Sequence, residues 1–118
     1  MKSLSMTLNL KNDAGIIEKY KEYHRAVWPE VVDDLRKIGV SKMKIFLSGR
    51  HLFMYLEVPD DFDLTRDFPR YMESPRAREW DTLMRGFQQR VPEASSGEWW
   101  SSMEEVFDID WKKTSSES

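Results

Sequence analysis

The segment HLFMYLEV, residues 51–58, constrains the fold more than any other part of the sequence. Strict alternation of this kind predicts a β-strand. One face of that strand carries Leu52, Met54 and Leu56. Phe53 and Tyr55 lie on the opposite face, so both faces are apolar. Because one layer of helices covers only one face of a sheet, a ligand, a second subunit or both must cover the other. We expect a face-to-face homodimer that encloses a small cavity.

The other hydrophobic patterns divide the chain into strands and helices. Alternation predicts strands, and apolar residues at three- and four-residue steps predict amphipathic helices. In chain order we expect a strand at 3–10, a helix at 14–38, two strands within 40–59, a helix at 75–91 and a strand at 103–110. This order is that of the ferredoxin-like split βαβ fold, an α+β arrangement in which two helices cover one face of a four-stranded antiparallel sheet.

Proline, glycine and short polar residues set the expected helix boundaries. Asn12 or Asp13 can cap the first helix. Pro29 should bend or restart that helix, and Gly39 ends it. Pro92 stops the second helix, whose apolar face would reach the residue before it.

The composition favours one globular domain over residues 1–111, followed by a disordered tail at 112–118. Hydrophobic residues make up 40% of the 118, enough for a core without disulfides or metals. The absence of cysteine removes thiol nucleophiles and thiolate metal sites. The charged residues are mixed in sign and sum to −3, which argues against a nucleic-acid partner. No apolar run is long enough to span a membrane. The alternating N-terminus does not resemble a signal peptide, so we expect a cytoplasmic protein.

A histidine lies on the apolar face of the first predicted helix. His24 follows Tyr20 by four residues and precedes Val27 by three, so it lies on their stripe. The side chains of Tyr20 and His24 can therefore act on one ligand. An imidazole exchanges protons near neutral pH, and a phenol can hydrogen-bond a hydroxyl group. Trp28 and Trp80 add flat apolar surface of the kind that packs on a sugar.

The residues alone leave a second interpretation open. A histidine on a helix stripe is more often a structural residue than a catalyst, and Tyr20 and Trp28 could equally be core aromatics. His51, beside the turn of the central hairpin, is expected at the surface. Histidines on different elements, without clustered carboxylates, argue against a metal site. Trp99 and Trp100 could cover either a cavity mouth or a dimer seam.

The residues around His24 resemble a known family. YKEYHRAVWPEVVDDLRKIGV is similar to the start of the L-rhamnose mutarotases, whose pattern is Tyr-x-x-x-His-x-x-x-Trp-Pro-Glu followed by a helix and a glycine. The matching positions here are Tyr20, His24, Trp28, Pro29, Glu30 and Gly39. The resemblance continues through KIFL, LFMYLEV, REWDTLM and MEEVFDI and covers residues 3–110. It implies a dimeric α/β barrel of ferredoxin-like subunits, a monosaccharide substrate and no cofactor.

The resemblance also implies roles for single residues. The family's motif histidine is the proton donor, and the tyrosine four residues before it binds the sugar. The resemblance assigns these roles to His24 and Tyr20. A tandem tryptophan pair in the family's second helix contacts the sugar; its first member matches Trp80, and its second is Asp81 here. A further sugar-binding tyrosine falls on or near Met43. The implied activity is exchange of the α and β anomers of a 6-deoxyhexose, L-rhamnose first and L-fucose as its rival, by general acid–base ring opening and closing.

Two functions from other classes remain open. The same barrel hosts small monooxygenases and haem-degrading enzymes, and a histidine in an apolar pocket beside tryptophan could serve a haem or an aromatic substrate. Alternatively the dimer binds sugar without catalysis, because Met43 and Asp81 alter two of the family's contacts.

Overall fold

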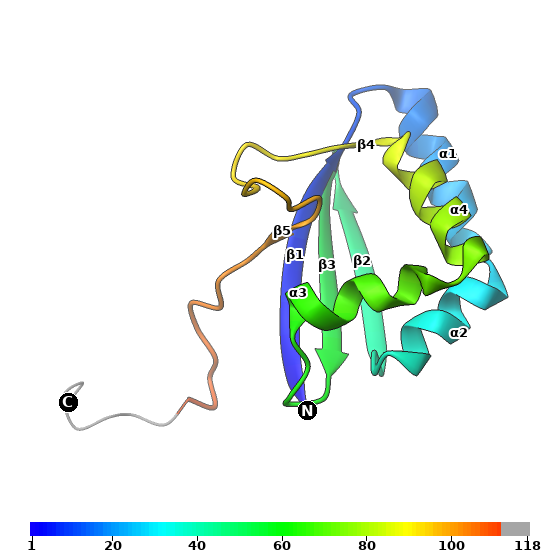
Figure 1. The fold of residues 1–118 in the computed structure, drawn as a ribbon. Coiled ribbons are helices and arrows are strands. Elements are labelled where there is room, and N and C mark those ends of the chain that lie inside the picture. The colour runs from blue at the N-terminus through cyan, green and yellow to red at the C-terminus, as the bar shows by residue number, and fades with distance from the viewer. Residues whose placement is uncertain (112–118) are drawn as a thin grey trace.

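The computed structural model describes residues 1–111 and contains an antiparallel sheet with the helices on one side (Figure 1). The elements are β1 Lys2–Leu10, α1 Ala14–Arg25, α2 Pro29–Lys37, β2 Lys42–Ser48, β3 His51–Val58, α3 Leu64–Asp67, the 3-10 helix η1 Phe68–Glu73, α4 Pro75–Arg85, β4 Gln88–Gln89 and β5 Ser101–Ser102. The sheet order is β2-β3-β1-β4, and β5 also pairs with β1. The predicted α+β class is confirmed, whereas the predicted tail at 112–118 lies outside the described residues.

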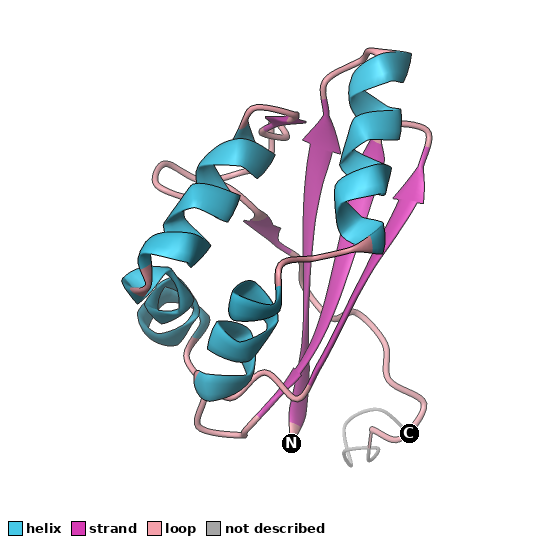
Figure 2. Ribbon diagram, turned by 90° about the vertical axis from the view of Figure 1, so that its right-hand side faces the viewer, coloured by secondary structure: helices cyan, strands magenta, loops and turns pink. Residues whose placement is uncertain are grey.

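The main core lies between the sheet and the helices because β1 and β3 place their apolar residues in register. Leu8 pairs with Leu52, and Met6 pairs with Met54. All four side chains are buried. The helices cover this one face of the sheet (Figure 2). Each fully buried aliphatic side chain contributes roughly 1.5–3 kcal/mol relative to its exposed state. None of the helices in residues 1–111 is both long and apolar enough to cross a membrane.

The predicted first helix is two helices, with the break where proline requires it. Asp13 caps α1 by accepting a hydrogen bond from the backbone N–H of Ile16 at 3.0 Å. Trp28 is extended, with ψ of 131°, because the ring of Pro29 disfavours a helical residue before it. Pro29 then begins α2, and Gly39, at φ of +112°, follows its end. The predicted cap, restart and end are confirmed, and the break leaves His24 in the last turn of α1.

The second predicted helix is six residues shorter than expected. The sequence predicted a helix over 75–91, but α4 ends at Arg85. The backbone beyond it bonds to β1 instead: the N–H of Lys11 donates to the carbonyl of Phe87 at 2.9 Å, and Gln88 pairs with Leu10. The prediction is therefore wrong beyond Arg85, and the turn toward the sheet buries the side chain of Gln88.

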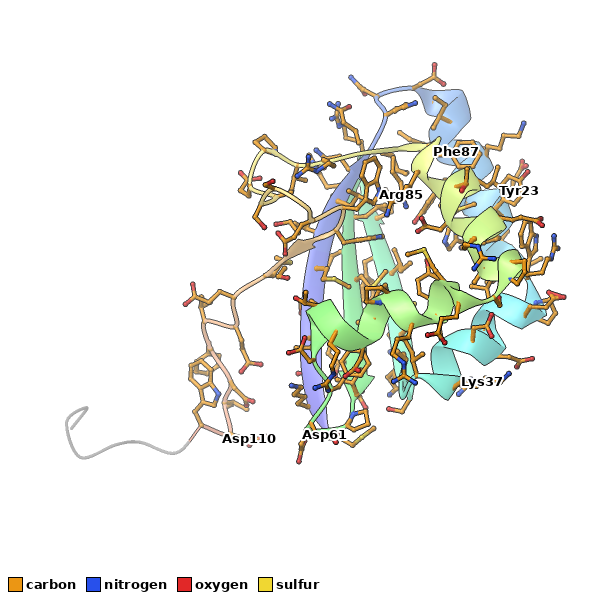
Figure 3. The ribbon with its side chains drawn as sticks, viewed as in Figure 1. Tyr23, Lys37, Asp61, Arg85, Phe87 and Asp110 are labelled. Carbon is orange, nitrogen blue, oxygen red and sulfur yellow. The ribbon has the colours of Figure 1, made fainter. Side chains whose placement is uncertain are left out.

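The predicted strand at 103–110 is also wrong. β5 covers only Ser101–Ser102, and the N–H of Met103 makes a last bond to the carbonyl of Ser5. The chain then leaves the sheet edge as an extended segment, here called the C-terminal arm (residues 103–111; Figures 1 and 3). A strand needs a paired edge, and this segment has no strand partner among residues 1–111. Val106 is 79% exposed and Ile109 is 83% exposed.

The outer face of the sheet, which points away from the helices, carries an aromatic pair on β2 and β3. Phe46 on β2 and Phe53 on β3 are register partners, and their rings stack with centroids 5.9 Å apart. Phe46 remains 56% exposed. Tyr55 lies on the same face of β3, so the prediction that this strand has two apolar faces is confirmed.

Candidate active site

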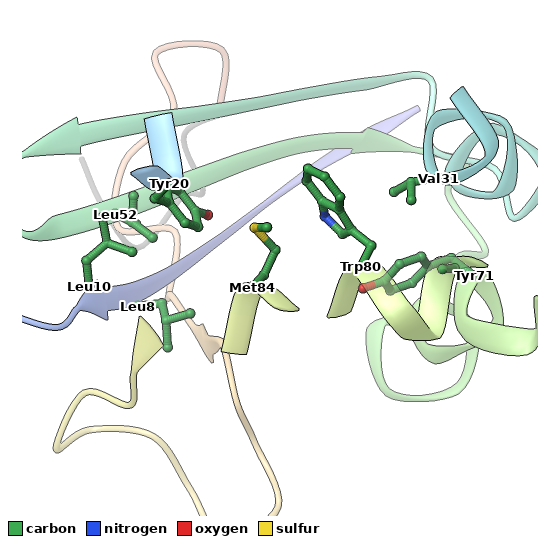
Figure 4. Close-up of a cluster of buried hydrophobic side chains, with 9 residues drawn as sticks. Leu8, Leu10, Tyr20, Val31, Leu52, Tyr71, Trp80 and Met84 are labelled. Carbon is green, nitrogen blue, oxygen red and sulfur yellow. The ribbon is translucent and has the colours of Figure 1, made fainter. Parts of the chain in front are cut away.

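A cavity of about 310 Å³ lies between the helices and the inner face of the sheet. Its volume is at the lower end of the roughly 300–1,000 Å³ of ligand sites. Its polar lining includes Tyr20, His24, Tyr71, Asp81, Arg85 and Gln88. Figure 4 shows Tyr20, Trp80 and Met84 among the buried side chains between the sheet and α4, and these three also line the cavity. The cavity thus combines apolar walls with a few polar groups.

One ring nitrogen of His24 is tied to the backbone. Its Nδ1 lies 2.9 Å from the carbonyl oxygen of Tyr20. Because a carbonyl only accepts, Nδ1 carries the proton, and the neutral ring keeps its lone pair on Nε2. Burial lowers the pKa of His24 below 6.5 by more than the backbone hydrogen bond raises it. Near pH 7 the imidazole is therefore neutral, and Nε2 is the nitrogen available to a ligand.

The hydroxyl of Tyr20 is joined to a loop tryptophan through an amide. The Tyr20 ring is 3% exposed, and its centroid lies 4.1 Å from that of His24. Gln88 Nε2 donates to the Tyr20 hydroxyl oxygen at 3.5 Å, and Gln88 Oε1 accepts from Trp99 Nε1 at 2.8 Å. Burial raises the pKa of Tyr20 to about 12, so the phenol stays protonated near neutral pH.

The carboxylate of Asp81 lies between a phenol and a guanidinium. Tyr71 donates its hydroxyl to Oδ1 at 3.1 Å, and Arg85 donates Nε to Oδ2 at 2.8 Å. Burial and the nearby Asp81 charge raise the pKa of Tyr71 well above its ordinary value. Two donors leave the carboxylate with free lone pairs, so it can accept further hydrogen bonds from ligand hydroxyls. The Arg85 guanidinium also lies 4.7 Å from the ring centroid of Trp99.

Of the two tryptophans predicted to contact the sugar, only one lines the cavity. Trp80 lines the cavity and meets the His24 ring edge-on, with centroids 5.4 Å apart. Trp28 is not among the residues of the cavity wall: its ring packs against Trp80 at 5.1 Å, and the guanidinium of Arg76 lies 3.7 Å from its centroid. Trp28 therefore packs behind Trp80, and its sugar contact stays a prediction. Met43 does reach the cavity.

The structure also places the remaining aromatic and histidine residues that the sequence singled out. Trp99 and Trp100 both line the cavity. His51 is exposed as expected, with Nδ1 2.7 Å from the side-chain oxygen of Asn9. Within residues 1–111 no group of three or more histidine or carboxylate side chains is placed to hold a metal ion.

Sequence reasoning missed Arg85 and Gln88. Arg85 follows Asp81 by four residues on one helix, and this spacing alone suggests an ion pair. No comparable signal identifies Gln88, because its place depends on a two-residue strand.

Comparison with known proteins gives one consistent result. The model of the family described as L-rhamnose mutarotase matches residues 3–109. A UPF0734 protein of Dictyostelium discoideum is 54% identical over 116 residues, 95% of this chain and 93% of that protein. An L-fucose mutarotase of Xanthomonas campestris pv. campestris is 37% identical over 109 residues, 91% of this chain and 87% of that protein. The crystal structure of an L-rhamnose mutarotase from Formosa agariphila has a TM-score of 0.67 at 27% identity, covering 93% of this chain and 100% of that one.

The family match includes the Tyr20–His24 pair of α1 and the Asp81–Arg85 pair of α4, and both pairs line the cavity. It also extends along the C-terminal arm to residue 109. The chain belongs to the L-rhamnose mutarotase family.

Proposed function

We propose that the protein is a cytoplasmic, homodimeric mutarotase that interconverts the α and β anomers of a 6-deoxyhexose. The observation that carries this proposal is the position of His24 in the wall of a cavity of about 310 Å³, with Nδ1 bound to the backbone carbonyl of Tyr20 and Nε2 available. Membership of the L-rhamnose mutarotase family supports the reaction class.

The chemistry requires one proton to move between two oxygens of the same carbon. Nε2 of His24 removes the proton from the anomeric hydroxyl, O1, and the resulting imidazolium delivers a proton to the ring oxygen, O5. The C1–O5 bond breaks with its electron pair on O5, and the O1 pair forms the aldehyde. Rotation about C1–C2 presents the other carbonyl face, and the reverse steps close the ring. No covalent bond to the protein forms, and atoms and charge balance.

Other cavity residues hold the sugar during this exchange. Tyr20 donates its hydroxyl to a sugar oxygen, because its high pKa keeps it protonated. Asp81 accepts from a sugar hydroxyl through the lone pairs that Tyr71 and Arg85 leave free. Trp80 and Met43 provide apolar surface for the C–H groups and the 6-methyl group of the sugar.

The two candidate sugars differ in configuration at C2 and C4. The relative named as an L-fucose mutarotase is 37% identical, whereas the L-rhamnose mutarotase of known structure is 27% identical. Asp81 adds a carboxylate to a cavity that is otherwise largely apolar, which favours recognition of hydroxyl orientation. We therefore place L-fucose beside L-rhamnose as a substrate to test first.

The proposed homodimer is supported by apolar surface that one chain leaves open. Within residues 1–111 no helix covers the outer-face pair of Phe46 and Phe53, and the C-terminal arm exposes Val106, Phe107 and Ile109. Both surfaces occur once in each chain, so a twofold arrangement can cover them reciprocally. Light scattering on the chain ended after Ser102 tests this: we expect the dimeric mass to fall to the monomeric mass, and an unchanged mass would contradict the arm's part in the interface.

Saturation-transfer NMR between the anomeric protons tests the activity directly. We expect purified protein to accelerate exchange in L-fucose or L-rhamnose above the solvent rate. Sugar binding without acceleration would support the non-catalytic alternative. A sharp, stoichiometric Soret shift with haemin, without an effect on either sugar, would support the haem alternative.

A further inference from the structure

We infer that Gln88, held in place by Trp99, is a positioning residue that makes the Tyr20 hydroxyl a hydrogen-bond donor toward the sugar. This inference rests on the proposed function and assigns the polarity of its sugar contact. Gln88 is 5% exposed and belongs to β4, far along the chain from Tyr20 in α1.

The first step is the orientation of the Gln88 amide. An indole nitrogen can only donate, so the amide atom 2.8 Å from Trp99 Nε1 must be the carbonyl oxygen. This assignment does not depend on distinguishing oxygen from nitrogen in the amide, because the reverse orientation would bring two donors together. Trp99 therefore fixes which end of the Gln88 amide faces the Tyr20 hydroxyl.

The second step is the direction of the next hydrogen bond. The NH₂ group of Gln88 lies 3.5 Å from the Tyr20 hydroxyl oxygen, and an NH₂ group only donates. The Tyr20 oxygen accepts this bond, so its own hydrogen is left for another acceptor. In the part of the chain that the structure describes, this hydroxyl has no other hydrogen-bond partner. Tyr20 lines the cavity, and a ligand oxygen there is the natural acceptor.

The resulting pair of groups has the polarity that a hemiacetal requires. Neutral His24 offers an acceptor at Nε2, and Tyr20 offers a donor, with the two ring centroids 4.1 Å apart. An anomeric hydroxyl donates to the first while a neighbouring sugar oxygen accepts from the second. Hydrogen bonds in series polarise one another, so the sequence from Trp99 through Gln88 to Tyr20 strengthens the last donor.

Gln88→Glu tests the direction of the bonds while preserving the side-chain shape. A carboxylate only accepts, so Tyr20 would donate to it and turn its hydrogen away from the sugar. We expect kcat/KM for anomer exchange to fall at least tenfold, with most of the loss in KM, on the order of one strong hydrogen bond. The matched control is Gln89→Glu, the adjacent exposed residue on the same strand, which should keep the wild-type rate.

A double-mutant cycle separates positioning from a structural role. Gln88→Leu should weaken sugar binding about fivefold in the wild-type chain and leave it unchanged in a Tyr20→Phe background, because it acts through that hydroxyl. Dissociation constants are measured by titration, and thermal unfolding confirms that each variant is folded. Equal losses in both backgrounds, or a Gln88→Glu variant with wild-type exchange, would overturn the inference. A wild-type chain that does not accelerate exchange would instead remove the proposed function, and this inference with it.

Discussion

Within a single chain, the inner face of the sheet is covered by helices, whereas the outer face remains exposed. On the inner face, polar groups lie in an apolar wall and each has a partner: a backbone carbonyl for His24, Arg85 and Tyr71 for Asp81. On the outer face, apolar groups lie open, and Phe46 is 56% exposed. Both faces come from the alternation of the same strands.

The difference indicates what each face still lacks. Partnered side chains have fixed orientations, so the inner face needs only a small polar ligand to complete its hydrogen bonds. Exposed aromatic surface gains free energy only when another macromolecule removes it from water. We therefore expect changes on the inner face to alter chemistry without altering assembly, and changes on the outer face to do the reverse.

The greatest loss is expected from a variant that removes the proposed catalytic group of the inner face and leaves the outer face unchanged. His24→Gln retains a polar side chain of similar length but removes the titratable nitrogen. Catalysed anomer exchange should fall by about 10²–10⁴-fold, the usual contribution of a general acid–base group. Saturation-transfer NMR measures the rate, and light scattering should show an unchanged mass.

The matched control for this change is the other histidine. His51 is exposed and bonded to Asn9 outside the cavity, so His51→Gln should exchange anomers at the wild-type rate. A His24→Gln variant that keeps the wild-type rate would remove His24 from the mechanism.

A second variant changes the outer face alone and should weaken self-association. Phe46→Glu places a charge on the surface that we propose to be buried between two copies, and self-association should weaken about a hundredfold, or roughly 3 kcal/mol. Because the cavity lining described here comes from one chain, the exchange rate per chain should change less than about twofold. Sedimentation at several concentrations gives the dissociation constant.

Val32→Glu is the control for that variant, since it makes the same apolar-to-acid change on the helical side of the molecule. Val32 is 36% exposed on α2, and its replacement should leave association unaltered. Equal weakening by both variants would show that added charge, and not the outer face, governs assembly.

The sequence predicted those parts of the fold that local patterns determine. The alternation at 51–58 placed β3 and its two apolar faces, and Pro29 and Gly39 placed the break and end of the first helical region. The errors arose where tertiary pairing decides the conformation. α4 ends at its glycine C-cap, and the bond between Lys11 and Phe87 then holds the following residues against β1, where the apolar spacing had predicted more helix.

The candidate site divides in the same way. Tyr20 and His24 are adjacent on one helix, so their spacing was sufficient to bring them together. The four-residue step from His24 does not keep Trp28 on the same helical face, because α1 ends at Arg25 and Trp28 is not helical. Gln88 and Trp99 meet through an irregular loop, which no periodic pattern describes.

A smaller change in sugar recognition is expected when the carboxylate of the inner face is replaced. Asp81→Asn preserves shape but removes the charge, and KM for the preferred sugar should rise about tenfold as a charge-assisted hydrogen bond is lost. The pair with Arg85 is partly exposed, so the free energy of unfolding should fall by only about 0–1 kcal/mol. Glu79→Gln, an exposed acid on the same helix paired with Arg76, serves as the control. An unchanged KM for both sugars would remove Asp81 from recognition.

The smallest expected effect is a displaced pH profile. Burial lowers the pKa of His24 from its ordinary 6.5, and the proposed reaction begins from the neutral ring. As pH falls, activity should therefore persist through 6.5 and be lost only below it, so the catalysed rate at pH 6.5 exceeds half the rate at pH 8. Arg85 neutralises Asp81 in the same cavity, and Tyr20, with a pKa of about 12, does not titrate in this range. Exchange rates corrected for the solvent reaction give the midpoint. A midpoint at or above 6.5 would mean that solvent or a nearby negative charge stabilises the imidazolium, and burial would no longer explain the chemistry of His24.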